Sequence, residues 1–209
     1  MKSIVLTLLL LNTAILFGQS AEECYQSARK EWAADNNKSA LKWIDKAIAA
    51  DADREEYYDC KGLILSEQGE FQKAYDAFSM GIAINPKASG IYLNRGNLFL
   101  SITQFEDAIA DFTQASIVAD NDTSKYSAIM NRASAKMQIR EFESAYDDLM
   151  KCYAFDSTEV GTLTNLGAVC DEIGRGDETL KYLLKAVEVD PNFYAAYGNI
   201  GFKYQEMGE

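Results

Sequence analysis

The chain has 209 residues, of which 48% are apolar, and its 32 acidic and 20 basic residues give a formal net charge of −12. We predict no nucleic-acid partner, because proteins that bind phosphate backbones neutralise them with lysine and arginine. The absence of histidine excludes every histidine-dependent triad and most transition-metal sites, and no glycine-rich phosphate loop occurs. We therefore predict no enzymatic activity, no metal site and no cofactor.

Residues 1–20 have the features of a secretory signal peptide. Lys2 precedes an apolar run from Ile4 to Phe17, and small and polar residues follow. A retained membrane anchor is the alternative, but a spanning helix needs about 20 apolar residues and this run is shorter. We expect a chain that is exported to the periplasm or secreted and that meets a membrane only indirectly.

Export would permit disulfide bonds among the four cysteines. They are Cys24, Cys60, Cys152 and Cys170. Four cysteines allow three pairings, and sequence alone does not choose among them. No pair has the Cys-x-x-Cys spacing of redox and metal motifs, so a role as small buried apolar residues is the other interpretation.

The rest of the chain contains an internal repeat, seen first in two sets of small residues. The first set has spacings of 34, 34, 37, 34 and 34 residues and consists of Ala28, Gly62, Gly96, Ala133, Gly167 and Gly201. The second set has spacings of 34, 34, 37 and 34 residues and consists of Ala40, Ala74, Ala108, Ala145 and Thr179. Two small residues at a fixed separation in each unit predict two helices that approach each other closely.

Helical periodicity supports this prediction. In the segment from Lys73, apolar residues recur at steps of three and four, which places them along one face of a helix. Large residues lie four positions after each member of the second set and should fill the space beside the close contact; they include Phe78, Phe112, Leu149 and Leu183. Gly69 and Gly174 are expected in the turn between the helices, while Pro86 and Pro191 should follow the second helix.

With these residues the chain resembles the tetratricopeptide repeat (TPR) proteins over residues 21–209. The second unit matches the large, small, alanine, aromatic, small and proline positions of the family with Tyr58, Gly62, Ala74, Phe78, Gly81 and Pro86. The predicted units are 21–54, 55–88, 89–122, 126–159, 160–193 and a partial sixth, 194–209. The resemblance implies an all-α fold, a right-handed α-solenoid of antiparallel helix pairs. About three additional residues near 122–124 are expected to lengthen one junction.

The sixth unit stops after its first helix and a glycine turn. Its apolar residues Tyr197, Ile200 and Tyr204 would then lack the second helix that covers their counterparts. Solenoids generally need a polar cap at each end. Either this helix is the cap or the natural chain continues past Glu209, and the apolar face favours a continuing chain.

Asparagine recurs at one position of the first helix in four consecutive units, as Asn94, Asn131, Asn165 and Asn199. The resemblance implies that first helices line a concave groove, where an amide can both donate to and accept from an extended peptide backbone. Further candidates for peptide contacts are Arg95, Asn97 and Arg132. The alternatives are that the asparagines bond neighbouring helices and that the arginines pair with abundant acids. We interpret Asp147 and Asp148 as part of a solvated helix face.

The predicted function is a non-catalytic module that binds a peptide or an unstructured protein segment in its groove. The family's lysines and arginines that clamp a terminal carboxylate have no counterparts here, so we expect a neutral or basic peptide. The alternative is a structural scaffold or sensor segment of a longer envelope protein.

Overall fold

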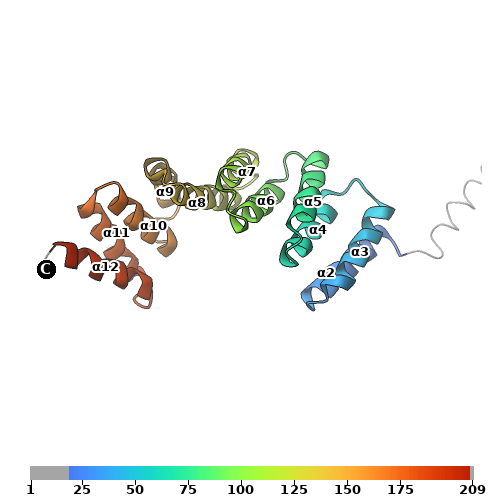
Figure 1. Ribbon diagram of the computed structural model, residues 1–209, viewed down its shortest axis with the longest axis horizontal. Helices are drawn as coiled ribbons and strands as arrows, with labels where there is room; N and C mark the ends of the chain where they lie inside the picture. The colour runs from blue at the N-terminus through green and yellow to red at the C-terminus, as the bar shows by residue number, and fades with distance from the viewer. Residues whose placement is uncertain (1–18, 208–209) are drawn as a thin grey trace, which may run out of the picture. The chain divides into compact units, whose positions relative to one another are not determined.

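The computed structural model describes residues 19–207, so the predicted signal peptide lies outside the described residues except for Gln19 and Ser20. The described residues form eleven α-helices and no strand (Figure 1). In the N-terminal unit, which ends at Pro86, the helices are α2 (Ala21–Ala33), α3 (Asn37–Ala50), α4 (Glu55–Glu67) and α5 (Phe71–Ile84). In the C-terminal unit, which begins at Lys87, they are α6 (Ser89–Ser101), α7 (Phe105–Val118), α8 (Asp122–Gln138), α9 (Phe142–Phe155), α10 (Val160–Glu172), α11 (Gly176–Val189) and α12 (Tyr194–Met207).

Both units are built from helix pairs. In the N-terminal unit α2 packs on α3 and α4 on α5, and α3 also contacts α4. In the C-terminal unit the pairs are α6 with α7, α8 with α9, and α10 with α11, while α12 packs on α11. We call the even-numbered helices first helices and the odd-numbered ones second helices. The all-α architecture of repeated helix pairs predicted from the sequence is confirmed.

Each helix pair is held at close range by the small residue of its first helix. A β-carbon added to Gly96 would lie 2.6 Å from Cε1 of the Phe112 ring, and one added to Gly167 would lie 2.7 Å from Cδ2 of Leu183. Real side chains do not approach this closely, so these positions require glycine while the large residue stays in place. The predicted contact between a small and a large residue therefore exists, and it fixes the distance between the two helices.

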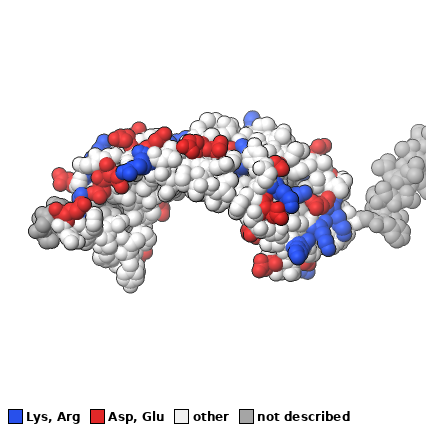
Figure 2. All heavy atoms as spheres, in the orientation of Figure 1, with Lys and Arg blue, Asp and Glu red and all other residues white. Residues whose placement is uncertain are grey.

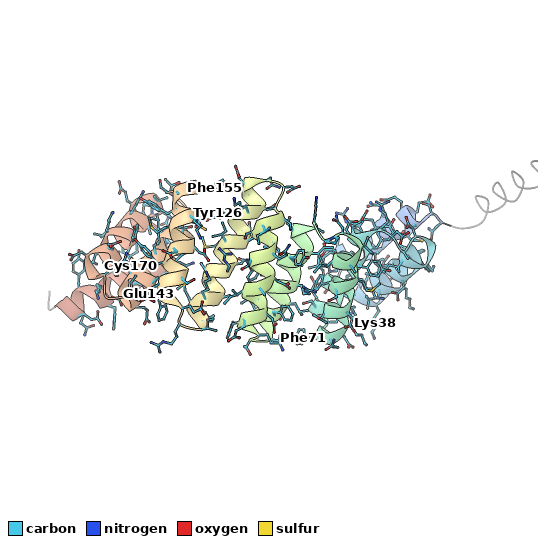
Figure 3. The ribbon with its side chains drawn as sticks, turned by 90° about the horizontal axis from the view of Figure 1, so that it is seen from above. Lys38, Phe71, Tyr126, Glu143, Phe155 and Cys170 are labelled. Atoms are coloured by element: carbon cyan, nitrogen blue, oxygen red, sulfur yellow. The ribbon has the colours of Figure 1, made fainter. Side chains whose placement is uncertain are left out.

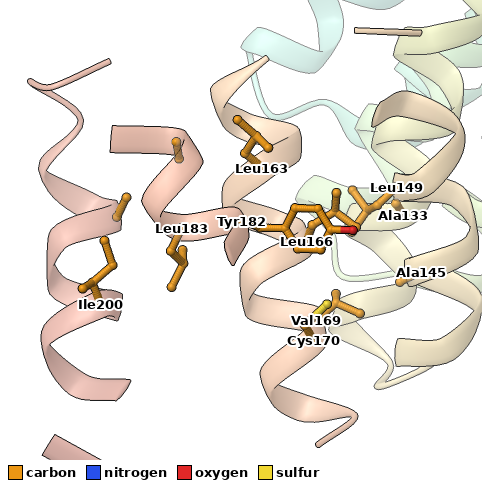
Figure 4. Close-up of a cluster of buried hydrophobic side chains, with 12 residues drawn as sticks. Ala133, Ala145, Leu149, Leu163, Leu166, Val169, Cys170, Tyr182, Leu183 and Ile200 are labelled. Atoms are coloured by element: carbon orange, nitrogen blue, oxygen red, sulfur yellow. The ribbon is translucent and has the colours of Figure 1, made fainter. Parts of the chain in front are cut away.

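Large apolar side chains fill the space between the pairs. Figure 4 shows the buried cluster of α8–α12, in which Leu149, Leu163 and Leu166 lie between helices. Ile200 of α12 belongs to this cluster and is only 8% exposed, and Tyr204 packs against it. The side of α12 that carries Ile200 therefore packs into the core of the C-terminal unit, whereas Tyr197 is 46% exposed.

The turn between first and second helices has a left-handed residue in every complete pair. Among residues 19–207, φ is positive at Asp35, Gly69, Thr103, Arg140 and Gly174. The next residue donates its backbone N–H to a carbonyl five positions back, as from Glu141 to Lys136 at 2.9 Å. This is the bond pattern of a Schellman motif, which satisfies carbonyls at the helix end. Glycine occupies two of these turns, as predicted. In the other three a residue with a side chain adopts positive φ, which is sterically unfavourable.

The first helix of the fourth repeat, α8, is longer than its counterparts. It has 17 residues, whereas α4, α6 and α10 have 13. Asn121 caps it, since its side chain accepts a hydrogen bond from the Ser124 N–H at 2.8 Å. The additional residues therefore form an extra first turn of α8 and do not lie in the junction before it.

Candidate functional site

The asparagine row, Asn94, Asn131, Asn165 and Asn199, lies entirely in the C-terminal unit. Its members come from α6, α8, α10 and α12, one per first helix. Because α6 contacts α8 and α8 contacts α10, the exposed residues of these three first helices form one continuous surface. Asn97 lies on the same helix as Asn94. The repeat thus places one amide per helix along this surface.

Two members of the row hydrogen-bond to the preceding first helix. Asn131 Nδ2 donates to Oδ1 of Asn97 at 3.2 Å, and Asn165 Nδ2 makes a 3.8 Å contact with Sδ of Met130. Both amides are half-buried. An asparagine amide has two donor hydrogens and two acceptor lone pairs, so a bond between repeats and a bond to a peptide are compatible.

The last member, Asn199, is exposed and lies at a small cavity. The cavity has a volume of about 160 Å³ and is formed by α10, α11 and α12. Phe202, which is 60% exposed, and Lys203 lie at the same cavity. Lys203 pairs with Asp171 of α10. The end of the asparagine row therefore combines an amide, an exposed aromatic ring and a paired cation.

The two arginines that follow row members point into the helix pairs. Arg95 Nε and Nη2 donate to the Asp111 carboxylate at 2.7 and 2.8 Å, and its side chain is 16% exposed. Arg132 binds Asp148 in the same bidentate manner at 2.7 Å and also donates to Oγ1 of Thr113 at 3.2 Å. This geometry supports the ion-pair interpretation of both arginines over a direct contact with a peptide.

Asp148 is the centre of a charged cluster that we call the Asp148 network. Its carboxylate accepts from Arg132, from Lys136 at 2.7 Å and from Lys151 at 2.8 Å, and the side chain is 1% exposed. Burial alone would raise the pKa of Asp148, but the hydrogen bonds from these three cations outweigh burial and hold it well below 3.8, its ordinary value. The interpretation of Asp148 as a solvated residue was therefore wrong, although Asp147 is exposed.

A signal for this network was present in the sequence. Arg132 and Asp148 are 16 residues apart, as are Arg95 and Asp111. The same offset relates Gly96 to Phe112, so the arginine and aspartate stand one position before a pair already expected to touch. The helix-pair geometry thus predicts that they meet.

All four cysteines are buried as free thiols. Burial raises the pKa of Cys60, Cys152 and Cys170 to about 11. Because the thiolate is the reactive form, these raised pKa values disfavour reaction of the three thiols at neutral pH. The structure thus agrees with the interpretation of the cysteines as buried core residues.

Residues 19–207 contain neither a metal-binding cluster nor a membrane-spanning helix. Within this part of the chain, no group of three or more cysteine, aspartate or glutamate side chains is arranged to hold a metal ion. No helix in the same range is long and apolar enough to cross a membrane. On the face of the C-terminal unit seen in Figure 2, acidic and basic side chains lie among uncharged residues without an extended basic surface.

Sequence relatives match parts of longer proteins. No protein-family model matches the sequence. DnaJ homolog subfamily C member 7 of Mus musculus is 30% identical over 97 residues, which are 44% of this chain and 19% of that protein. Tetratricopeptide repeat protein 6 of Homo sapiens is 24% identical over 177 residues, which are 67% of this chain and 34% of that protein. The chain thus spans about a third of these relatives or less.

Solved structures match over most of the chain. A tetratricopeptide repeat protein from Parabacteroides merdae ATCC 43184 has a TM-score of 0.78 at 20% identity and covers 91% of this chain and 75% of its own. YrrB, described as a TPR protein with an unusual peptide-binding site, has a TM-score of 0.72 at 17% identity, with 86% and 91% covered. MamA has a TM-score of 0.65 at 26% identity, with 70% and 84% covered. The fold is that of tetratricopeptide repeats, as the repeat spacing predicted.

Proposed function

We propose that the chain is a non-catalytic protein-interaction module and that the asparagine row binds a peptide or an unstructured protein segment. The observation that carries this proposal is the regular placement of one amide per first helix. An amide can donate to and accept from a peptide backbone whatever the peptide's side chains, so a row of them suits an extended ligand. The likeness to YrrB, described as having a peptide-binding site, supports the same class of function.

The charges of this surface favour a neutral or basic peptide. Arg95 and Arg132 lie next to the row but are committed to buried aspartates. Releasing Arg95 would remove the bidentate partner of Asp111, and releasing Arg132 would remove that of Asp148; losing a partner is costly for a buried carboxylate. The chain as a whole carries a net charge of −12, which attracts cationic segments over a distance.

A second candidate function is a scaffold or sensor segment of a longer envelope protein. The observation in its favour is the exposed aromatic surface of α12, where Tyr194 is 78% and Phe202 is 60% exposed. Apolar surface of this kind is suited to contact with another domain. Proteolytic footprinting of the full-length natural protein would test this, since a docked domain should protect α12 from cleavage.

Export is part of the proposal and rests on the composition of residues 1–20. A cleaved signal peptide predicts a mature chain in the periplasm or the medium whose first residue lies near Ser20. Fractionation followed by N-terminal sequencing of the mature protein tests this. An intact N-terminus in the cytoplasm would contradict it.

The peptide-binding proposal is tested by removing the row. In the variant all four asparagines, Asn94, Asn131, Asn165 and Asn199, are changed to alanine. The matched control removes four exposed amides elsewhere, Gln68, Gln104, Gln138 and Asn192. Crosslinking and mass spectrometry on the envelope fraction should show that partners of the wild-type chain are lost with the row variant and retained with the control.

Circular dichroism of both variants must match that of the wild-type chain. If the partners persist with the row variant, binding takes place on another face. The scaffold function would then replace the proposed one.

A further inference from the structure

The fourth repeat contains a pocket that the other helix pairs lack the residues to form. It has a volume of about 280 Å³ and lies between α8 and α9. Tyr126, Ile129, Cys152 and Phe155 provide its apolar wall, and Lys125 and Lys151 lie at its rim. We call it the Tyr126 pocket. It shares no residue with the asparagine row.

The extra turn of α8 helps to build this pocket. Asp122 and Lys125, which line it, belong to the turn by which α8 exceeds the other first helices. The aromatic pair is equally specific to the fourth repeat. At the position of Tyr126 the other complete pairs have Ala21, Glu55, Ser89 and Val160, and at the position of Phe155 they have Ala50, Ile84, Val118 and Val189.

Hydrogen bonds from the next repeat hold one wall of the pocket in place. The Tyr126 hydroxyl lies 2.9 Å from Oγ1 of Thr162 and donates to Oε2 of Glu159 at 3.1 Å. Glu159 in turn caps α10 by accepting from the Gly161 N–H at 3.0 Å. The Tyr126 ring is thus fixed at its polar end, and the rest of the ring faces Phe155 with the ring centroids 5.2 Å apart.

The opposite wall is apolar and open to solvent. Phe155 is 54% exposed although it is aromatic and lies on a second helix (Figure 3). Burying such a ring against an apolar ligand group is favourable, since it removes apolar area from water. The volume is just below the usual 300–1,000 Å³ of cofactor and drug-sized sites, so the pocket suits a single side chain.

The charges at the rim of the pocket determine which kind of residue is favoured next to the bound apolar side chain. Lys125 is exposed, and the Lys151 side chain is 58% exposed even though its ammonium also contacts Asp148. Asp122 carries the one carboxylate among the residues that line the pocket, and the nearby Glu159 carboxylate is engaged by the Tyr126 hydroxyl and the Gly161 N–H. The rim is therefore locally cationic on a chain whose net charge is −12. A carboxylate next to the bound apolar group would be attracted to it.

We propose that the Tyr126 pocket is a second recognition site that binds an apolar side chain of a partner peptide followed by an acidic residue. The side chain lies between Tyr126 and Phe155, and the carboxylate lies at Lys125. This site is independent of the asparagine row. A partner that engages both sites would carry a neutral or basic extended segment and a separate apolar-acidic anchor.

The test uses a minimal probe, the blocked dipeptide acetyl-Phe-Asp-amide, with acetyl-Phe-Asn-amide as its uncharged match. Binding is followed by NMR of the full chain labelled in isoleucine methyl groups, because Ile129 lines the pocket. We expect a saturable shift of the Ile129 methyl signal. The aspartate probe should bind about threefold to fivefold more tightly than the asparagine probe, the range expected of a solvent-exposed ion pair.

Three variants sharpen the result. Phe155→Ala should weaken binding about tenfold, whereas Val189→Ala, the equivalent change in the fifth repeat, should not affect it. Lys125→Glu should abolish the preference for the aspartate probe. The fourfold asparagine-row variant should bind as the wild-type chain does, which separates this site from the proposed groove.

Because Phe155 is largely exposed, its variant should keep the helical circular dichroism of the wild-type chain. The absence of a saturable Ile129 shift, or an unchanged affinity in Phe155→Ala, would overturn the proposal. Equal affinity for the two probes would overturn the proposed contact between the ligand carboxylate and Lys125.

Discussion

The fourth and fifth repeats place opposite chemistry at the same two positions of the helix pair. In the fourth, Arg132 of α8 meets Asp148 of α9 in a buried ion pair. In the fifth, Leu166 of α10 and Tyr182 of α11 occupy the equivalent positions, and both are buried. Both solutions support a helix pair of the same kind. The repeat therefore requires that the two residues complement each other, and it does not prescribe how.

The two solutions differ in what happens when one partner is lost. An apolar contact loses burial and leaves a cavity. A buried ion pair leaves a charge without a partner in a site that excludes water, which costs more. The Asp148 network should therefore make the fourth repeat more sensitive to single changes than the fifth.

The largest expected effect follows from Asp148→Ala, which removes the carboxylate that binds Arg132, Lys136 and Lys151. We expect a loss of about 3–5 kcal/mol in the free energy of unfolding, measured by urea denaturation. The control is the double variant Arg132→Leu with Asp148→Tyr, which copies the fifth repeat. It should lose much less, because an apolar pair can replace a buried ion pair. Equal losses in both variants would contradict the comparison.

Acid should affect the two repeats differently. The pKa of Asp148 is lower in the folded chain than its ordinary 3.8, so the unfolded chain binds more protons near this pH. The stabilisation is therefore complete at neutral pH and is lost as the pH falls from about 5 toward the folded pKa. Urea midpoints at several pH values should fall more steeply for the wild-type chain than for the double variant.

The small residue of the first helix in the fifth repeat can be changed to the alanine that the fourth repeat has at this position. Gly167 faces Leu183, whereas the fourth repeat has Ala133 with Leu149. In Gly167→Ala the new β-carbon would lie 2.7 Å from Leu183, and we expect a loss of about 1–3 kcal/mol in unfolding free energy. Gly201→Ala is the matched control, because apart from its chain neighbours and the adjoining backbone of α12 no atom lies within 4 Å of the added β-carbon. Helix propensity should make this control neutral or stabilising.

The turns between the helices also differ between the two repeats, and here it is the fourth repeat that carries the unfavourable residue. Arg140 in the fourth repeat has φ 63° and Gly174 in the fifth has φ 74°. Arg140→Gly should raise the free energy of unfolding by about 0.5–1 kcal/mol, because glycine adopts this conformation without steric cost. Gly174→Ala should lower it by a similar amount. Thermal unfolding of both variants checks the signs, and a stabilised Gly174→Ala would refute the strain argument.

The smallest expected effect concerns the asparagine row. Asn131→Ala removes the bond to Asn97, which lies at a partly exposed position. The expected loss is about 0.5 kcal/mol, as for most surface substitutions. A loss above about 2 kcal/mol in urea denaturation would show that the asparagine is chiefly structural.

The fold was readable from the sequence because its determinants recur. Gly96 and Phe112 sit at a separation that is repeated along the chain, and a contact required in every repeat leaves a periodic trace. Turns such as those at Gly69 and Gly174 were also readable. Thr103 and Arg140 were not, because their left-handed conformation is imposed by the helices on both sides and contradicts their own preference.

Residues that depart from the repeat were harder to interpret. Asp148 follows an exposed aspartate in an acidic chain, so the composition suggested that its side chain is also exposed to solvent. Only its separation from Arg132 in the sequence indicates that the two residues form an ion pair. The extra turn of α8 was visible as an insertion, but its helical conformation depends on the Asn121 cap. The sequence does not indicate which ligand is bound, because asparagine amides that contact a peptide backbone do not require particular residues around them.

The hydrogen bond between Asn131 and Asn97 has a mechanical consequence. It spans two successive repeats, so its length changes whenever α8 and α6 move apart. Nδ2 of Asn131 carries a second hydrogen, so a ligand that binds beside this tie need not break it. A segment bound along the row as proposed would then act in parallel with the tie, and both would resist separation of α6 and α8.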